Sequence, residues 1–94
     1  MTNKEYIFEN LEAAIALDAV SQGEKFFSDI KTYIEVTSGV NVILASKVRE
    51  VIGELIKRGL IKLFHKEIPN IYVVTAEGKE LVKEAKQKQE HKSK

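Results

Sequence analysis

One stretch of the sequence decides the fold: Ser46-Lys-Val-Arg-Glu-Val-Ile-Gly-Glu-Leu-Ile-Lys-Arg-Gly-Leu-Ile61. Apolar residues recur there with the period of an α-helix, which we place at about residues 43–58. The predicted buried stripe of this helix consists of Leu44, Val48, Val51, Ile52, Leu55 and Ile56. Its predicted outward face consists of Ala45, Ser46, Arg49, Glu50, Gly53 and Lys57. Gly59 is expected to end the helix, because glycine readily adopts the left-handed conformation found at helix ends.

The residues that follow predict a β-hairpin and a last helix. Alternating apolar residues indicate strands at 60–66 and 71–75, joined by Glu67-Ile-Pro-Asn70. This linker suits a turn, since proline fits its second position and asparagine tolerates the left-handed conformation at its third. Thr75 is placed to cap a helix over residues 76–88, and residues 89–94 are expected to form a flexible basic tail.

The residues that precede the central stretch predict two further helices, at 3–20 and 24–36. Thr2 with Glu5, and Ser21 with Glu24, have the spacing of capping boxes. The first helix is apolar on two faces and therefore needs cover on two sides. The expected fold is mainly α with a small β-hairpin (α+β), in the order α-α-α-β-β-α, and forms one domain over residues 1–88.

Composition narrows the classes of function. The chain has 94 residues and no cysteine, which excludes disulfides, thiolate metal sites and cysteine nucleophiles. It lacks a phosphate-binding loop, a nucleophile–histidine pair and metal-ligand spacing, so we expect no enzymatic activity, no cofactor and no metal. No apolar run approaches the ~18 residues that span a bilayer. The expected compartment is the cytoplasm, without membrane partners.

The charges are distributed unevenly. Residues 1–40 carry three basic and seven acidic side chains, a balance of −4, whereas residues 41–94 carry twelve basic and seven acidic ones, a balance of +5. This asymmetry indicates one face built for an anionic partner. The alternative is that lysine and glutamate simply solvate the helix faces.

Two segments resemble a known family. The segment 46–61 resembles the recognition helix and following strand of winged helix-turn-helix regulators of the PadR and MarR kind, which often read S-x-x-V/L-x-x-x-L-x-x-L-x-x-x-G-L-I. The segment Ile71-Tyr-Val-Val-Thr-Ala-Glu-Gly-Lys-Glu-Leu81 resembles their wing exit, Y-x-L-T-x-x-G-R/K-x-L. The short layout also resembles the small PadR-like site-binding proteins of crenarchaeal plasmid segregation systems. The resemblance implies sequence-specific binding of double-stranded DNA, either by a transcriptional regulator or by a nucleoid-associated partition protein with an adaptor partner.

The resemblance also implies where DNA contacts lie. In such proteins the N-terminal half of the recognition helix enters the major groove, and the wing contacts the backbone. The matching positions here are Asn41, Ser46, Lys47, Arg49, Glu50, Lys62 and Lys66. Arg49 is the expected base reader, because a guanidinium can bond guanine O6 and N7 together. The alternative for Arg49 is an exposed side chain paired with Glu50.

A homodimer is expected, because one small domain makes few phosphate contacts and paired half-sites raise affinity. The first and last helices are the candidate interface, with Tyr6, Leu17, Leu81 and Val82 as contacts. The alternative is that the first helix is covered within its own chain.

Two other functions remain open. The Gly59-Leu-Ile-Lys62 and Ile71-Tyr72 pattern also resembles a winged-helix protein of the small ribosomal subunit, which would bind RNA. That family begins with a very basic extension, and this chain begins acidic. The third reading is a winged helix that binds only other proteins.

Overall fold

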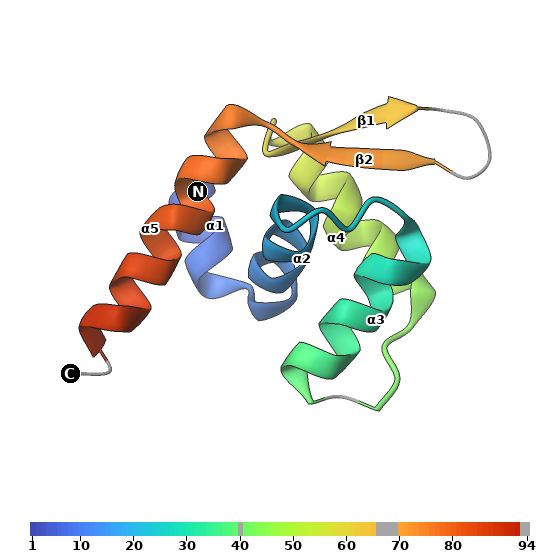
Figure 1. Cartoon of the computed structure of the whole chain (residues 1–94), viewed down its shortest axis with the longest axis horizontal. Coiled ribbons are helices and arrows are strands. Elements are labelled where there is room, and N and C mark those ends of the chain that lie inside the picture. The colour runs from blue at the N-terminus through green and yellow to red at the C-terminus, as the bar shows by residue number, and fades with distance from the viewer. Residues whose placement is uncertain (40, 66–69, 93–94) are drawn as a thin grey trace.

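The computed structural model describes residues 1–39, 41–65 and 70–92, and it combines a helical body with one hairpin (Figure 1). The elements are α1 (Asn3–Glu9), α2 (Leu11–Ser21), α3 (Phe27–Ser38), α4 (Ala45–Lys57), β1 (Ile61–His65), β2 (Ile71–Val74) and α5 (Ala76–Lys92). The two strands form an antiparallel sheet. The predicted α+β class, mainly helical with a small hairpin, is confirmed. None of the helices, within these described ranges, is long and apolar enough to cross a bilayer.

Helix α2 lies at the centre of the molecule (Figure 1) and contacts α1, α3, α4, α5 and β2. Ala13, Ala16, Leu17 and Ala19 on this helix have no exposed surface. Small residues let neighbouring helices approach closely, and Leu17 fills the space between them. The sequence predicted that this helix needs cover on more than one side, and the surrounding elements supply it.

The predicted helix 3–20 is in fact two helices. Asn10 breaks it with an extended backbone, φ −123° and ψ 100°. Its side-chain amide donates to the carbonyl of Tyr6 at 2.9 Å, while its own carbonyl accepts from the N–H of Ala14 at 3.0 Å. Asparagine thus ends α1 and starts α2, since its short amide competes with helical hydrogen bonds. The apolar periodicity continues across Asn10, so the sequence pattern did not reveal the break.

The first capping box is confirmed, and the second is wrong. The N–H of Glu5 donates to Thr2 Oγ1 at 3.1 Å, and the N–H of Thr2 donates to Glu5 Oε1 at 3.0 Å. The hydroxyl of Ser21 instead donates backwards to the carbonyl of Asp18 at 2.7 Å, within α2. Helix α3 therefore begins at Phe27, three residues later than predicted, and no described side chain caps it.

The hairpin packs one face on the helices. Its register pairs Ile61 with Val74 and Leu63 with Tyr72, and a bulge follows Leu63. Ile61 and Tyr72 are buried, whereas Lys62 between the inward-facing residues is exposed. The N–H of Tyr72 also donates to the carbonyl of Lys25 at 3.0 Å, which ties β2 to the α2–α3 connection. The predicted turn at 67–70 lies largely outside the described residues, which resume at 70.

A dense set of bonds joins α4, both strands and α5 at Gly59 and Leu60. Gly59 has φ +75°, its N–H donates to the carbonyl of Ile56, and the N–H of Leu60 donates to Leu55, each at 3.0 Å. This is a Schellman ending. The hydroxyl of Thr75 lies 2.7 Å from the Gly59 carbonyl and 3.0 Å from that of Leu60.

The same threonine starts α5, as predicted. Its Oγ1 accepts from the N–H of Gly78 at 3.1 Å, and its own N–H donates to the Leu60 carbonyl at 3.0 Å. A Cβ at Gly78 would overlap the Leu60 carbonyl oxygen, so only glycine allows α5 to approach this closely. We call the set Gly59, Leu60, Thr75 and Gly78 the junction.

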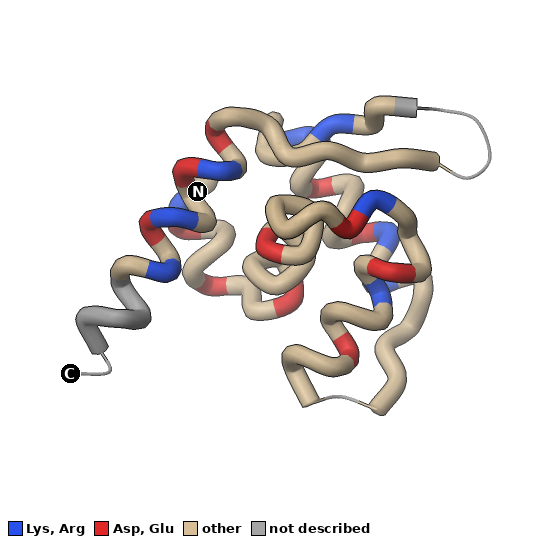
Figure 2. The backbone as a smooth tube through the Cα atoms, in the orientation of Figure 1, with Lys and Arg blue, Asp and Glu red and all other residues tan. Residues whose placement is uncertain are grey.

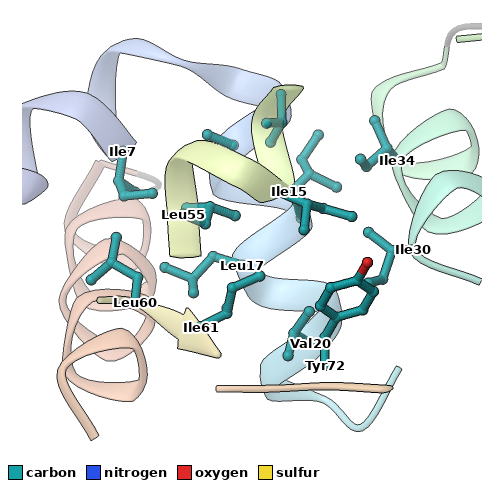
Figure 3. Packing of buried hydrophobic residues seen from close by; sticks show 14 of the residues in the cluster. Ile7, Ile15, Leu17, Val20, Ile30, Ile34, Leu55, Leu60, Ile61 and Tyr72 are labelled. Carbon is teal, nitrogen blue, oxygen red and sulfur yellow. The ribbon is translucent and has the colours of Figure 1, made fainter. Parts of the chain in front are cut away.

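The core forms where side chains from α1, α2, α3, α4, α5 and both strands converge (Figure 3). Val48, Val51, Ile52 and Leu55 of the predicted α4 stripe are buried. Leu44 and Ile56 are exposed instead, and so is Phe26 before α3. Leu44 is exposed because α4 starts at Ala45, two residues later than predicted, so that Leu44 precedes the helix and does not share its face. Helix α5 continues to Lys92, beyond the predicted end at residue 88.

Asp18 links three helices through one carboxylate. Its Oδ2 accepts from the hydroxyl of Tyr33 on α3 at 2.6 Å and from the amide of Gln22 at 3.0 Å. Its Oδ1 lies 3.4 Å from Nζ of Lys86 on α5. Burial raises the pKa of Asp18, but the bonds from Tyr33, Gln22 and Lys86 outweigh it, so the pKa falls below its ordinary 3.8. The bond to Asp18, more than burial, raises the pKa of Tyr33 to about 12.

We expect opposite effects of the same substitution at two glycines. Gly78→Ala should destabilise the fold by about 2 kcal/mol or more, because the new Cβ forces α5 away from the junction. Gly53→Ala is the matched control: nothing lies within 4 Å of a Cβ there, so relief of glycine's flexibility in mid-helix should stabilise by about 0.5–1 kcal/mol. Urea denaturation measures both. Equal effects of the two substitutions would contradict the assigned role of Gly78.

Asp18→Asn should make stability less dependent on pH. Because the folded pKa of Asp18 lies below its unfolded value, the carboxylate stabilises the fold above about pH 4, and this contribution is lost as pH falls through the folded pKa. We expect the variant to lose on the order of 1 kcal/mol at pH 7. The gap between variant and wild type should close towards pH 2 in denaturation curves. A gap that is constant with pH would contradict the ionised role of Asp18.

Candidate nucleic-acid interface

The face of α4 that points away from the core is uncovered. The helix buries one stripe against α2 and β1, and its other side chains are solvent-exposed along most of its length. The predicted site residues Ser46, Lys47, Arg49 and Glu50 are all exposed on its first two turns, and Asn41 is exposed just before it. The structure therefore brings these five residues to one end of one helix, and no described part of the chain occludes them.

Arg49 is held in place by an aromatic ring. Its guanidinium carbon lies 5.4 Å from the centroid of Phe27, the first residue of α3. Phe27 is half-buried against the core, so the ring itself is fixed. A guanidinium over an aromatic face gains about 0.5–1 kcal/mol at an exposed site. The side chain of Arg49 therefore lies along the α3 side of α4, and the expected alternative, a pair with Glu50, is not the contact observed.

The second arginine of this region has a structural role. Arg58 Nε donates to Glu54 at 2.7 Å, and its guanidinium carbon stacks 4.3 Å from the ring centroid of Tyr6. Its Nη1 reaches the carbonyl of Met1 and the side chain of Asn3, each at 3.3 Å, so it joins α1 to the end of α4. Of the two arginines on this segment, Arg49 alone lies on the uncovered face.

The opposite edge of α4 carries charges of both signs. A hollow of ≈ 350 Å³ between α1, α2 and α4 is lined by Tyr6, Asn10, Glu12, Lys47, Glu50, Glu54 and Arg58, among others. Burial and the nearby carboxylate of Glu54 are the leading causes of a raised pKa at Tyr6. Three carboxylates and two cations meet on this edge, and Arg58 pairs with Glu54. The described residues contain no acid or histidine cluster suited to a metal. Lys47 lies on this edge and Arg49 lies on the α3 side, so a cation flanks the uncovered face of α4 on each edge.

The hairpin offers one described site residue. Lys62 is exposed on the hairpin face turned away from the core, opposite Val73. Lys66 lies outside the described residues. In the view of Figure 1 the end of β1 and the beginning of α4 both lie on the right, whereas α1 and α5 lie on the left. Figure 2 shows acidic positions on the helices at the left, at the centre and at the right of the view, with basic positions among them.

The residues predicted for dimerisation are used within the chain. Leu17 has no exposed surface, Leu81 and Val82 are 7% and 9% exposed, and Tyr6 lies half-buried under Arg58. Their expected placement at a surface is therefore corrected, and the alternative of a first helix covered by its own chain is what the structure has. Sequence reasoning missed Leu11, which is 63% exposed beside an apolar hollow of ≈ 190 Å³ between α1, α2 and α5.

Comparisons with known proteins add no relative: no protein-family model matches the chain, and no curated protein matches it. The site therefore has to be interpreted from its own geometry.

The contact between Phe27 and Arg49 can be measured through stability. Phe27→Leu keeps an apolar side chain against the core but removes the aromatic face, and Arg49→Ala removes the cation. A double-mutant cycle with these substitutions should show a coupling of about 0.5–1 kcal/mol. Additive effects within experimental error would contradict the contact. The same cycle between Phe27 and Lys57, an exposed cation later on α4, serves as the control and should be additive.

Proposed function

We propose that the protein binds double-stranded DNA as a winged helix-turn-helix domain. Helix α4 is the recognition helix, which enters the major groove, and the β1–β2 hairpin is the wing, which contacts the backbone. The observation that carries this proposal is the uncovered face of α4, on which Ser46, Lys47 and Arg49 are exposed together. An α-helix fits the major groove, and contacts concentrate on its N-terminal half.

The arrangement of the chain supports the winged-helix interpretation. Helices α3 and α4 are joined by residues 39–44, a longer connection than a tight helix-turn-helix turn, and are followed directly by the hairpin and α5. The structure also explains why the two motifs, G-L-I and T-x-x-G, contain these residues. Glycine in G-L-I ends α4, and threonine and glycine in T-x-x-G hold the wing exit on that ending. The resemblance to PadR-like and MarR-like proteins thus falls on residues that fix the geometry of the domain.

The charges favour one orientation on DNA. Glu12, Glu50 and Glu54 outnumber Lys47 and Arg58 on the edge of α4 towards α1, so a phosphate is favoured there only beside Lys47. Arg49 lies on the other edge, over the ring of Phe27. Lys25 lies two residues before Phe27 in the chain. In this orientation Arg49 reads a base, Lys47 and Lys62 neutralise phosphates, and Asn41 and Ser46 contact bases or phosphates.

The biological role that fits best is a transcriptional regulator or a partition-site protein acting on the nucleoid. Both roles use a homodimer on paired half-sites, and a partition protein also binds an adaptor. The apolar hollow beside Leu11 supports a dimer surface on the side of the molecule away from α4. Leu17 and Val82 of the expected set line this hollow but are buried within the chain, so Leu11 is the side chain that would meet a partner.

The proposal is tested by Arg49→Ala. A preferred site is first selected from a random duplex library with the wild-type protein. The variant should then bind that site about 5- to 150-fold more weakly, the 1–3 kcal/mol of one bidentate base contact, while its affinity for unrelated DNA changes little. Fluorescence anisotropy at fixed salt measures both affinities.

Lys83→Ala is the matched control, since Lys83 is an exposed cation on α5, remote from α4. It should leave both affinities unchanged. Wild-type protein that binds no duplex at physiological salt would contradict the proposed function and favour a protein-binding domain.

A further inference from the structure

The connection between α3 and α4 is apolar and uncharged in a chain that is rich in charge. Residues 36–46 carry no charged side chain. Val42 and Leu44 are among the last three residues before α4, and they are 71% and 72% exposed. In Figure 2 the described part of the connection is a tan corner beyond the charged helices. Two aliphatic side chains thus stand in solvent directly before the proposed recognition helix.

The segment that carries them is fixed. The N–H of Ile43 donates to Glu35 Oε2 at 2.9 Å, and the same oxygen lies 2.8 Å from Nζ of Lys31. The side chain of Ile43 packs against the core. Side chains alternate along an extended backbone, so an inward Ile43 directs Val42 and Leu44 outward. Their exposure follows from how the segment is anchored.

Leu44 also departs from the usual residue preference at the N-cap of a helix. It is the N-cap of α4, a position where Ser, Thr, Asp or Asn would bond the free amides of the first turn. No side chain among the described residues caps this helix. An exposed leucine there contributes neither a cap nor buried apolar surface, and such local conflicts concentrate at functional sites.

We propose that Val42 and Leu44 contact the 5-methyl groups of thymine, so that the protein selects sites with thymine next to the base read by Arg49. This inference rests on the proposed function. The thymine methyl is the one apolar group on base edges in the major groove, and aliphatic side chains recognise it by contact. The two residues are continuous along the chain with Ser46 and Lys47, so the same approach to DNA brings both sets to the groove.

The test replaces thymine by deoxyuridine in the selected duplex. This removes each 5-methyl group and keeps every base pair and hydrogen-bonding group. Wild-type protein should bind the deoxyuridine duplex about 4-fold more weakly for each contacted methyl, the effect of burying one such group. The variant V42A/L44A should bind the thymine duplex more weakly and should no longer distinguish the two duplexes. Single replacements at each thymine then locate the contact.

Val36→Ala is the matched control, because Val36 is also an exposed aliphatic residue but lies on α3. It should keep the wild-type ratio between the two duplexes. Equal wild-type affinity for both duplexes would overturn the inference, and so would a V42A/L44A variant that keeps the full ratio. Both results leave the proposed function intact, whereas it fails only if wild-type protein binds no duplex. A V42A/L44A variant that loses a protein partner but keeps its DNA affinity and ratio would assign the two residues to protein docking.

Discussion

The carbonyl of Leu60 is the point on which the rest of the structure depends. It accepts from the N–H and hydroxyl of Thr75, and it lies where a Cβ at Gly78 would stand. The end of α4, the start of β1, the end of β2 and the start of α5 are therefore held at one place. Because α4 and the hairpin both leave this point, their relative direction is fixed before any ligand arrives, which lowers the cost of ordering a binding surface.

The neighbouring helices determine which parts of α4 are buried and which stay exposed. Helix α2 buries the inner stripe of α4, and Arg58 joins the end of α4 to α1, so that its inner side and its C-terminal end are occupied. Only the outer face and the N-terminal end stay open. Phe27 places the one arginine of that face on the edge away from the carboxylates. Packing thus leaves Lys47 and Arg49 on opposite edges of the open face.

The sequence correctly predicted the features that depend on residues close together in the chain. The buried stripe of α4, the glycine ending at Gly59, the Thr75 cap and the exposure of Arg49 all follow from local periodicity and capping. The break at Asn10 was missed because apolar spacing continues across it. Leu44 matched the stripe but lies one residue before the helix, and periodicity does not locate that boundary. Leu17 and Arg58 depend on which helices come together in space, which no local pattern contains.

We propose that the N-terminal half of α4 is the surface that meets DNA. Amide chemical shifts of isotopically labelled protein, titrated with its selected duplex, test it most directly, because they map contacts without altering any residue. We expect the largest changes at residues 41–50, with a second group at Lys62 on the hairpin. Changes confined to α1 and α5, with residues 41–50 unaffected, would contradict it.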